Sequence, residues 1–200
     1  MQTSHRLFGW LLAACSLAIL AGCATGPRVT TDFDPEADFA RYRTWAFYQP
    51  IAMEQSGYST FMTERIRADV RREMEARGYA FDDKSPDLRV NFQGIVQEKT
   101  DVYSVPRNDF QYFYSYRRRS YFAVPFWYDE TQVNRYTEGT LTVDLVDAAR
   151  NRLVWTGAAI GRVTRKTPQE RGADVDNAIS EIFLRYPYRA GIGEPVVPVK

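Results

Sequence analysis

Apolar and polar residues alternate most regularly between residues 88 and 97, which predicts a strand of an antiparallel sheet with one covered face. Four further β-branched or alternating stretches predict strands: 28–33, 44–48, 140–145 and 153–163. A turn at 147–151 joins the last two of these. The last strand carries Gly157, Ala158 and Ala159, and such small residues allow a covering element to approach closely.

Two other stretches have the period of a helix. Apolar residues recur every fourth position at Met62, Ile66, Val70 and Met74, after a capping Ser59 or Thr60 and before Gly78. Thr167-Pro168-Gln169-Glu170 forms a capping box that begins a second helix, which Pro187 ends. The order of elements predicts an α+β fold. We expect a two-layer sandwich, with a mainly antiparallel sheet of about five strands and two helices on one face.

The N-terminus resembles the signal of a bacterial lipoprotein. The apolar run from Leu7 to Leu20 follows His5 and Arg6 and is too short to span a bilayer comfortably. Leu20-Ala21-Gly22-Cys23 resembles a lipobox, in which the signal is cut before the cysteine and the cysteine is acylated. This implies a cleaved signal at 1–22 and a lipidated tether at 23–27. The alternative is an ordinary secretory signal followed by a free cysteine.

The expected location follows from this anchor. Position 24 is Ala, whereas Asp at this position usually marks retention of proteobacterial lipoproteins at the inner membrane. We therefore expect the chain to be attached through Cys23 to the outer membrane, facing the periplasm. A single domain is predicted at 28–187, followed by a flexible C-terminal tail at 188–200.

Composition excludes several kinds of chemistry. Lys and Arg number 26 against 25 Asp and Glu, so no basic field favours nucleic acid. The single His and both Cys lie within residues 1–23, which excludes Ser-His-Asp and Cys-His catalysis and His- or Cys-based zinc sites in the domain. We expect no cofactor, no metal and no catalytic residue. Three carboxylate pairs remain as candidates for glycan hydrolysis, although we interpret them as turn caps: Asp32 with Asp34, Glu98 with Asp101, and Asp144 with Asp147.

An insertion at 102–135 is the unusual part of the chain. Eleven aromatic residues lie between Tyr103 and Tyr128, around three consecutive arginines. Tyr, Trp and Arg are enriched at binding hot spots, so the insertion is a candidate contact surface for an envelope protein, a glycan or a lipid headgroup. The alternative is an aromatic hairpin packed on its own sheet. The candidate partner-binding residues are Tyr112, Tyr114, Tyr116, Arg117, Arg118, Arg119, Tyr121 and Trp127.

A series of short motifs resembles the bacterial lipoprotein family catalogued as domain of unknown function 4136. In order these are Cys23, Thr31-Asp32-Phe33-Asp34-Pro35, Arg77-Gly78-Tyr79, Pro86-Asp87-Leu88-Arg89-Val90, Glu138-Gly139-Thr140-Leu141 and Leu153-Val154-Trp155-Thr156-Gly157. The resemblance implies an envelope domain with no assigned reaction. Our interpretation is a membrane-anchored periplasmic lipoprotein that is a non-enzymatic binding or adaptor domain. The alternatives are a small carboxylate-dependent hydrolase and a protein that binds lipid or another apolar ligand in its core.

Overall fold

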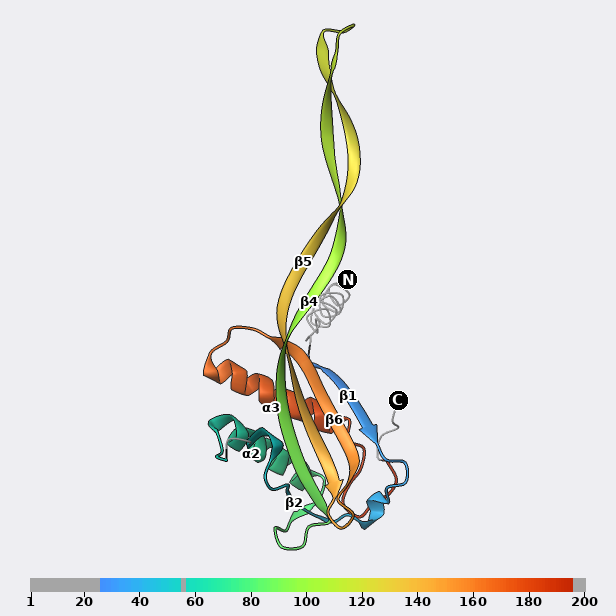
Figure 1. The fold of residues 1–200 in the computed structure, drawn as a ribbon. Helices are drawn as coiled ribbons and strands as arrows, with labels where there is room; N and C mark the ends of the chain where they lie inside the picture. The colour runs from blue at the N-terminus through green and yellow to red at the C-terminus, as the bar shows by residue number, and fades with distance from the viewer. Residues whose placement is uncertain (1–25, 55–56, 196–200) are drawn as a thin grey trace, which may run out of the picture.

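The computed structural model describes residues 26–54 and 57–195, so the predicted signal, Cys23 and residues 196–200 lie outside it. One mixed sheet has the strand order β1-β6-β5-β4-β2-β3, and helices α2 and α3 lie on one of its faces (Figure 1). The strands are β1 (Arg28–Phe33), β2 (Thr44–Phe47), β3 (Ala80–Phe81), β4 (Leu88–Ser115), β5 (Ser120–Asp147) and β6 (Arg152–Val163). The helices are η1 (Phe39–Arg41), η2 (Ala52–Glu54), α2 (Phe61–Ala76) and α3 (Pro168–Leu184). The predicted α+β class is confirmed.

The sheet differs from the prediction in two details. It has six strands rather than about five, because the two-residue strand β3 extends its edge. Strand β2 runs parallel to both β3 and β4. Helix α2 follows β2 in the chain and returns it to the end of the sheet at which β3 and β4 begin. The remaining pairings, β1 with β6, β6 with β5 and β5 with β4, are antiparallel.

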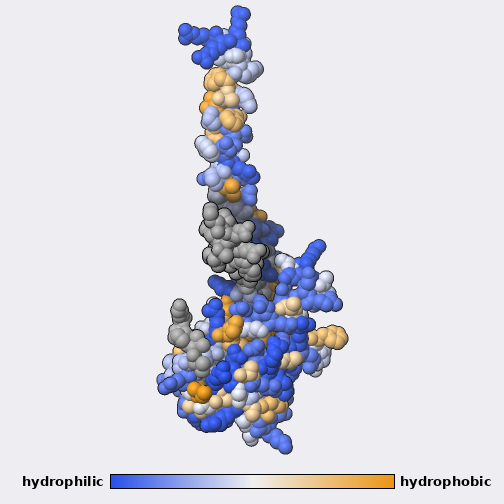
Figure 2. Space-filling view, turned by 180° about the vertical axis from the view of Figure 1, so that it is seen from behind, coloured by the Kyte–Doolittle hydropathy of each residue, from blue (hydrophilic) through white to orange (hydrophobic). Residues whose placement is uncertain are grey.

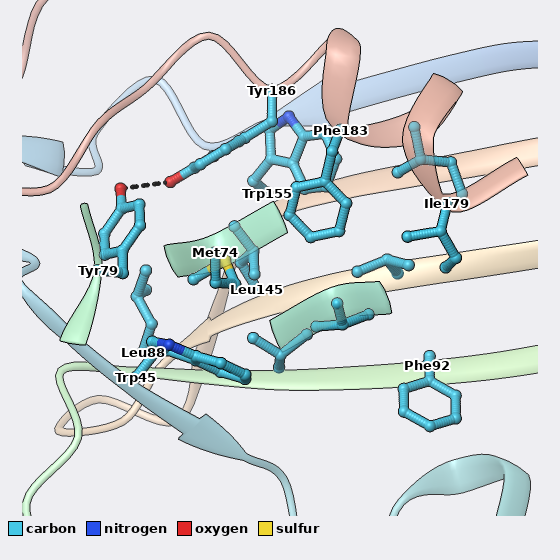
Figure 3. Packing of buried hydrophobic residues seen from close by; sticks show 14 of the residues in the cluster. Trp45, Met74, Tyr79, Leu88, Phe92, Leu145, Trp155, Ile179, Phe183 and Tyr186 are labelled. Carbon is cyan, nitrogen blue, oxygen red and sulfur yellow. Dashed lines mark hydrogen bonds between the residues drawn. The ribbon is translucent and has the colours of Figure 1, made fainter. Parts of the chain in front are cut away.

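The hydrophobic core lies between the sheet and the two helices (Figure 3). Strands β4, β5 and β6 contribute Leu88, Phe92, Leu145 and Trp155, while the helices contribute Ile66, Val70, Met74, Ile179, Ile182 and Phe183. The hydroxyl groups of Tyr79 and Tyr186 are 2.8 Å apart at one end of this core (Figure 3). Both helices begin with reciprocal capping boxes, at Thr60 with Thr63 and at Thr167 with Glu170.

Gly157 explains how closely α3 approaches the sheet. A Cβ atom at this position would lie 2.7 Å from Cγ2 of Ile182 and 2.5 Å from Cη2 of Trp155. Such distances are shorter than van der Waals contact, so a larger residue would push the helix or the indole ring away. The prediction that small residues of this strand admit a covering element is confirmed at Gly157.

Packed structure continues beyond residue 187, where the sequence predicts the domain to end. The ring of Tyr188 stacks on Phe39 with centroids 3.7 Å apart, and Tyr188 is buried. The backbone N–H of Gly191 donates to the carbonyl of Tyr42, at 2.9 Å. This ordering depends on contacts with a segment about 150 residues earlier, which local sequence patterns do not report. No helix within residues 26–54 and 57–195 is long and apolar enough to cross a membrane.

Candidate binding site on the projecting hairpin

Strands β4 and β5 continue far beyond the rest of the sheet. They pair without interruption from Leu88 with Asp147 to Ser115 with Ser120, whereas β6 accompanies β5 only as far as Thr137. Residues 99–115 and 120–136, with the turn between them, therefore form a two-stranded ribbon, here named the outer hairpin (Figure 1). The predicted insertion at 102–135 is thus the outer part of two continuous strands. The alternative that it packs on its own sheet is wrong, because the ribbon projects away from the sheet (Figure 1).

The aromatic end of the outer hairpin, residues 110–128, exposes aromatic side chains on both faces. Paired residues of adjacent strands share a face, so Tyr114 with Tyr121 marks one face and Phe113 with Phe122 marks the other. Ten aromatic side chains in this segment are each 41–88% exposed. The ring centroids of Phe113 and Phe122 are 5.8 Å apart, and those of Tyr114 and Tyr121 are 5.1 Å apart. Cross-strand contacts thus hold the ribbon together without burying its side chains.

Three arginines form the tip. Arg117, Arg118 and Arg119 follow Tyr116 in the turn between the strands, and Arg119 has a positive φ of 50°. Residues 110–128 contain no Asp or Glu, so the aromatic end carries three positive charges and no negative charge. The nearest ion pair along the ribbon joins Arg107 Nε to Glu130, at 2.7 Å. In Figure 2 the tip is hydrophilic and the ribbon directly below it is hydrophobic.

All eight candidate partner-binding residues lie on the aromatic end. Tyr112 and Tyr114 belong to β4, Tyr121 and Trp127 belong to β5, and the remaining four form the tip. Five further exposed aromatic residues, which were not among the predicted candidates, share this ribbon: Phe110, Phe113, Phe122, Phe126 and Tyr128. Phe110 lies on the face of Tyr112 and Tyr114, whereas the register between the two strands places the other four on a second exposed aromatic face.

The three carboxylate pairs have separate structural surroundings. Asp34 pairs with Arg152 at 2.9 Å, while Asp32 accepts a hydrogen bond from the N–H of Phe33. Glu98 and Asp101 are three residues apart on a strand, which places them on opposite faces, and Asp101 contacts Arg162. The remaining pair is divided in the same way. Asp144 accepts from Thr156 Oγ1, whereas buried Asp147 accepts from the hydroxyl group of Tyr42 at 2.9 Å. Two of the three pairs thus lie on opposite faces of their strands, and the carboxylates of Asp32 and Asp34 contact different partners.

The described residues outside the outer hairpin and its turn, 26–54, 57–98 and 137–195, are here named the body. Several ionisable groups of the body have shifted pKa values with structural causes. Burial raises the pKa of Tyr79 to about 12 and raises that of its partner Tyr186. Burial opposes ionisation of Asp87, but hydrogen bonds from the N–H groups of Arg43 and Thr44 outweigh it and lower its pKa. Burial raises the pKa of Asp69, which accepts a 2.6 Å hydrogen bond from Arg72. The contacts of Tyr79 and Asp87 join separate segments of the chain, whereas Asp69 and Arg72 lie in the same helix, α2.

A surface hollow of about 420 Å³ lies between α2 and the β2–β3 edge of the sheet. The guanidinium of Arg67 lies 4.9 Å from the ring of Phe47, and that of Arg71 lies 4.2 Å from the ring of Phe81. Cations thus cover the aromatic rings of this hollow, which is not the apolar core cavity that the lipid-binding alternative requires. Within residues 26–54 and 57–195, no three His, Cys, Asp or Glu side chains are grouped to hold a metal ion.

Comparison with protein families assigns the chain. The family model described as "Domain of unknown function (DUF4136)" matches residues 29–188. This range includes both long helices and all six strands, except for Arg28, the first residue of β1. The chain belongs to the DUF4136 family. No curated protein matches it. The match leaves the activity of the DUF4136 domain unassigned.

Solved structures show distant likeness to this DUF4136 protein. A PDZ domain protein from Parabacteroides distasonis is 14% identical with a TM-score of 0.48, over 84% of this chain and 37% of that chain. The present chain therefore spans well under half of that protein. A PelC dodecamer from Paraburkholderia phytofirmans is 11% identical with a TM-score of 0.37, over 82% of this chain and 99% of that chain. Likeness at this level carries no functional inference.

Proposed function

We propose that this DUF4136 protein is a non-enzymatic binding protein of the bacterial cell envelope. In this proposal acyl chains on Cys23 hold it at the membrane, and the aromatic end of the outer hairpin binds its partner. The observation that carries the proposal is the exposure of ten aromatic side chains on both faces of one ribbon.

Exposed aromatic residues at this density favour a binding role. Monomeric proteins rarely expose large contiguous apolar patches, and those that do commonly use them for contact with a partner. An isolated two-stranded ribbon is marginally stable in water, because it lacks a third strand or a packed element to cover its apolar groups. Tyr, Trp and Arg also bury a large area with few rotatable bonds, which suits them to interface hot spots. Contact with a partner would therefore remove apolar surface that the body leaves uncovered.

The base of the ribbon is well supported. Strands β4 and β5 lie in the middle of the sheet, between β2 and β6, and their inner residues Val90, Phe92, Val143 and Leu145 are buried. A binding element that continues from the core loses less conformational freedom on binding than a loop does. The body of the molecule therefore supports the outer hairpin as a directed arm.

The anchor can be tested separately from the arm. Cells grown with radiolabelled palmitate should label the wild-type protein, and the Cys23→Ser substitution should remove the label. Two acyl chains or more give stable attachment, so the wild-type protein should also fractionate with membranes. A wild-type protein that carries no label would contradict the proposed anchor while leaving the proposed role of the hairpin open to the next experiment.

Site-specific photocrosslinking in cells tests the arm. A photoreactive amino acid would replace Tyr116, which is 88% exposed at the tip, or Tyr58, which is 66% exposed on the body and serves as the control. We expect a discrete protein, glycan or lipid adduct from position 116 and none of the same kind from position 58. Identical adducts from both positions, or none from position 116, would contradict the proposed binding role of the hairpin.

A further inference from the structure

We propose that the aromatic end of the outer hairpin binds the headgroup layer of the same bilayer that holds the acylated Cys23. This inference rests on the proposed function and names its partner as a lipid surface that contains anionic phospholipids. It follows from the direction in which the chain enters the body, the reach of the tether, the charge of the tip and the open edges of the ribbon.

The chain enters the body at the end from which the outer hairpin leaves. The first residue of β1, Arg28, pairs with Ile160, which lies three residues before the end of β6. The end of β6, Val163, pairs with Thr137 at the base of the outer hairpin. Strand β1 then runs away from the hairpin along the edge of the sheet (Figure 1). Both membrane-related elements, the predicted tether at 23–27 and the hairpin, therefore connect to one end of the molecule.

The tether cannot reach the opposite end. Its five residues span at most about 18 Å, whatever their conformation. Strand β6 has 12 residues and extends about 40 Å along the body. The membrane that holds the acylated Cys23 must therefore lie near the base of the hairpin. The outer hairpin, with 17 residues in each strand, is about 55 Å long and starts at this base. It must therefore lie along the membrane or slope toward it. Pointing straight at the bilayer would drive a ribbon much longer than the tether into the apolar layer, and pointing away would place the body between the anchor and the bilayer.

The chemistry of the aromatic end fits a headgroup layer. Guanidinium groups bind phosphate oxygens through two parallel hydrogen bonds, and the tip presents three arginines among residues that include no carboxylate. Tyr and Trp concentrate at membrane–water interfaces, where the ring is apolar and its polar atom stays hydrated. A flat protein surface would cover one face of the ribbon, whereas a lipid layer surrounds both aromatic faces.

The open edges of the ribbon set its depth. Beyond the sheet, the outward backbone N–H and C=O groups of β4 and β5 have no neighbouring strand in the part of the chain that the structure describes. Such groups are costly in hydrocarbon but can bind water and phosphate among the headgroups. A single copy of the hairpin should therefore stay in the interface instead of crossing the apolar layer.

Trp127 provides the probe for this inference. It is 73% exposed, whereas Trp45 and Trp155 are 0% and 1% exposed in the body. The acylated protein, purified from membranes, would be reconstituted into vesicles of phosphatidylethanolamine with phosphatidylglycerol, or of phosphatidylcholine alone. A Trp127→Phe variant supplies the background from the other tryptophans. We expect Trp127 emission to shift to shorter wavelength and to be quenched by brominated lipids in the vesicles that contain phosphatidylglycerol.

A charge-matched pair of variants isolates the contribution of the tip. Replacing Arg117, Arg118 and Arg119 together with Ser should lower the quenching of Trp127 to its level in phosphatidylcholine. Three other arginines provide the control, because they are exposed at the opposite end of the body: Arg41, Arg150 and Arg185. Their replacement with Ser removes the same charge and should leave the quenching unchanged. Raised salt should weaken the wild-type signal, because it screens exposed charges.

Two results would overturn this inference. One is a Trp127 that stays accessible to aqueous iodide and unquenched by brominated lipid in all vesicles. The other is a Trp127 that is protected in native membranes but not in lipid vesicles, which would indicate that the partner is another component of the envelope. The second result contradicts the lipid inference and leaves the proposed binding function standing, so the two can be told apart.

Discussion

Strands β4 and β5 pass through two very different surroundings within one continuous ladder. In the body, Leu88, Val90 and Phe92 face α2 and α3 and are fully buried. The aromatic end carries larger apolar side chains on both of its faces, yet all of its aromatic residues are exposed. The helices explain this contrast, because 16 or 17 residues of helix extend about 25 Å, whereas a strand of 28 residues extends about 90 Å. Apolar side chains on a strand can contact other apolar groups, but they are buried in a core only where a second element covers the strand.

Substituting one tryptophan in the body and one in the outer hairpin should give the largest difference in the free energy of unfolding between the two regions. Trp155 is buried against Phe183 and Tyr186, so Trp155→Ala should lower the free energy of unfolding by about 3–5 kcal/mol. Trp127→Ala, on the outer hairpin, should change it by less than about 0.5 kcal/mol. Urea unfolding followed by far-ultraviolet circular dichroism measures both. Comparable losses in the two variants would show that the outer hairpin contributes to the stability of the body.

Two glycines of β6 make a finer test of packing. Gly157→Ala should cost about 1–3 kcal/mol, because the new methyl group would overlap Trp155 and Ile182. Gly161→Ala is the control, since a Cβ there would meet only Pro27, at 3.8 Å. Thermal unfolding of both variants gives the comparison. If Gly161→Ala were the more destabilising change, close approach of α3 would not be the reason for glycine at 157.

Asp87 gives a prediction that depends on pH. Its pKa is lower in the folded state than its ordinary value of 3.8, so its contribution to stability is present above that value and is lost as the pH falls through the folded pKa. Asp87→Asn should cost about 1–2 kcal/mol at pH 7, because the single amide oxygen would accept from the N–H groups of Arg43 and Thr44 without a negative charge. The difference from wild type should shrink below about pH 4. Urea unfolding at a series of pH values checks this, and a difference independent of pH would contradict it.

Shortening the outer hairpin should have the smallest effect on the body. Residues 104–131 can be replaced by Asn-Gly, because Tyr103 and Gln132 are paired and a two-residue turn can join them. The hydrogen bond from the hydroxyl group of Tyr103 to Gln132 Oε1 would remain. We expect the free energy of unfolding to change by less than about 0.5 kcal/mol, since the removed residues are outside the core. Hydrogen exchange should show the same protection of β1, β6 and α3 as in the full chain; a global loss would contradict the separation of the two regions.

Local patterns predicted much of the body. The period of the helices, the capping box at Thr167 and the small residue at 157 each depend on neighbours in the sequence, and the structure confirms them. The packing of Tyr188 on Phe39 was missed, because it joins distant segments that show no shared pattern.

The aromatic and arginine content of the sequence predicted which segment holds the candidate site, but it did not predict that this segment is a projecting ribbon. Residues 116–119 contain none of the Gly or Asn that usually mark a tight turn, and positive φ falls on Arg119 instead. Aromatic residues on both faces also hide the period of two that made 88–97 easy to recognise. The register of two strands, which turns a list of aromatic residues into an arm with two faces, depends on long-range pairing.

The open edges of the outer hairpin also affect how the protein must be produced. An uncovered strand edge is a template for another strand. Residues 121–128 are eight consecutive uncharged residues, five of them aromatic, and only Pro125 among them disfavours strand pairing. Copies that accumulate away from their binding surface would pair edge to edge and aggregate. The yield of soluble protein should therefore depend on how quickly each newly made chain reaches its binding surface. Prompt delivery would cover a segment whose strand edges stay exposed after folding.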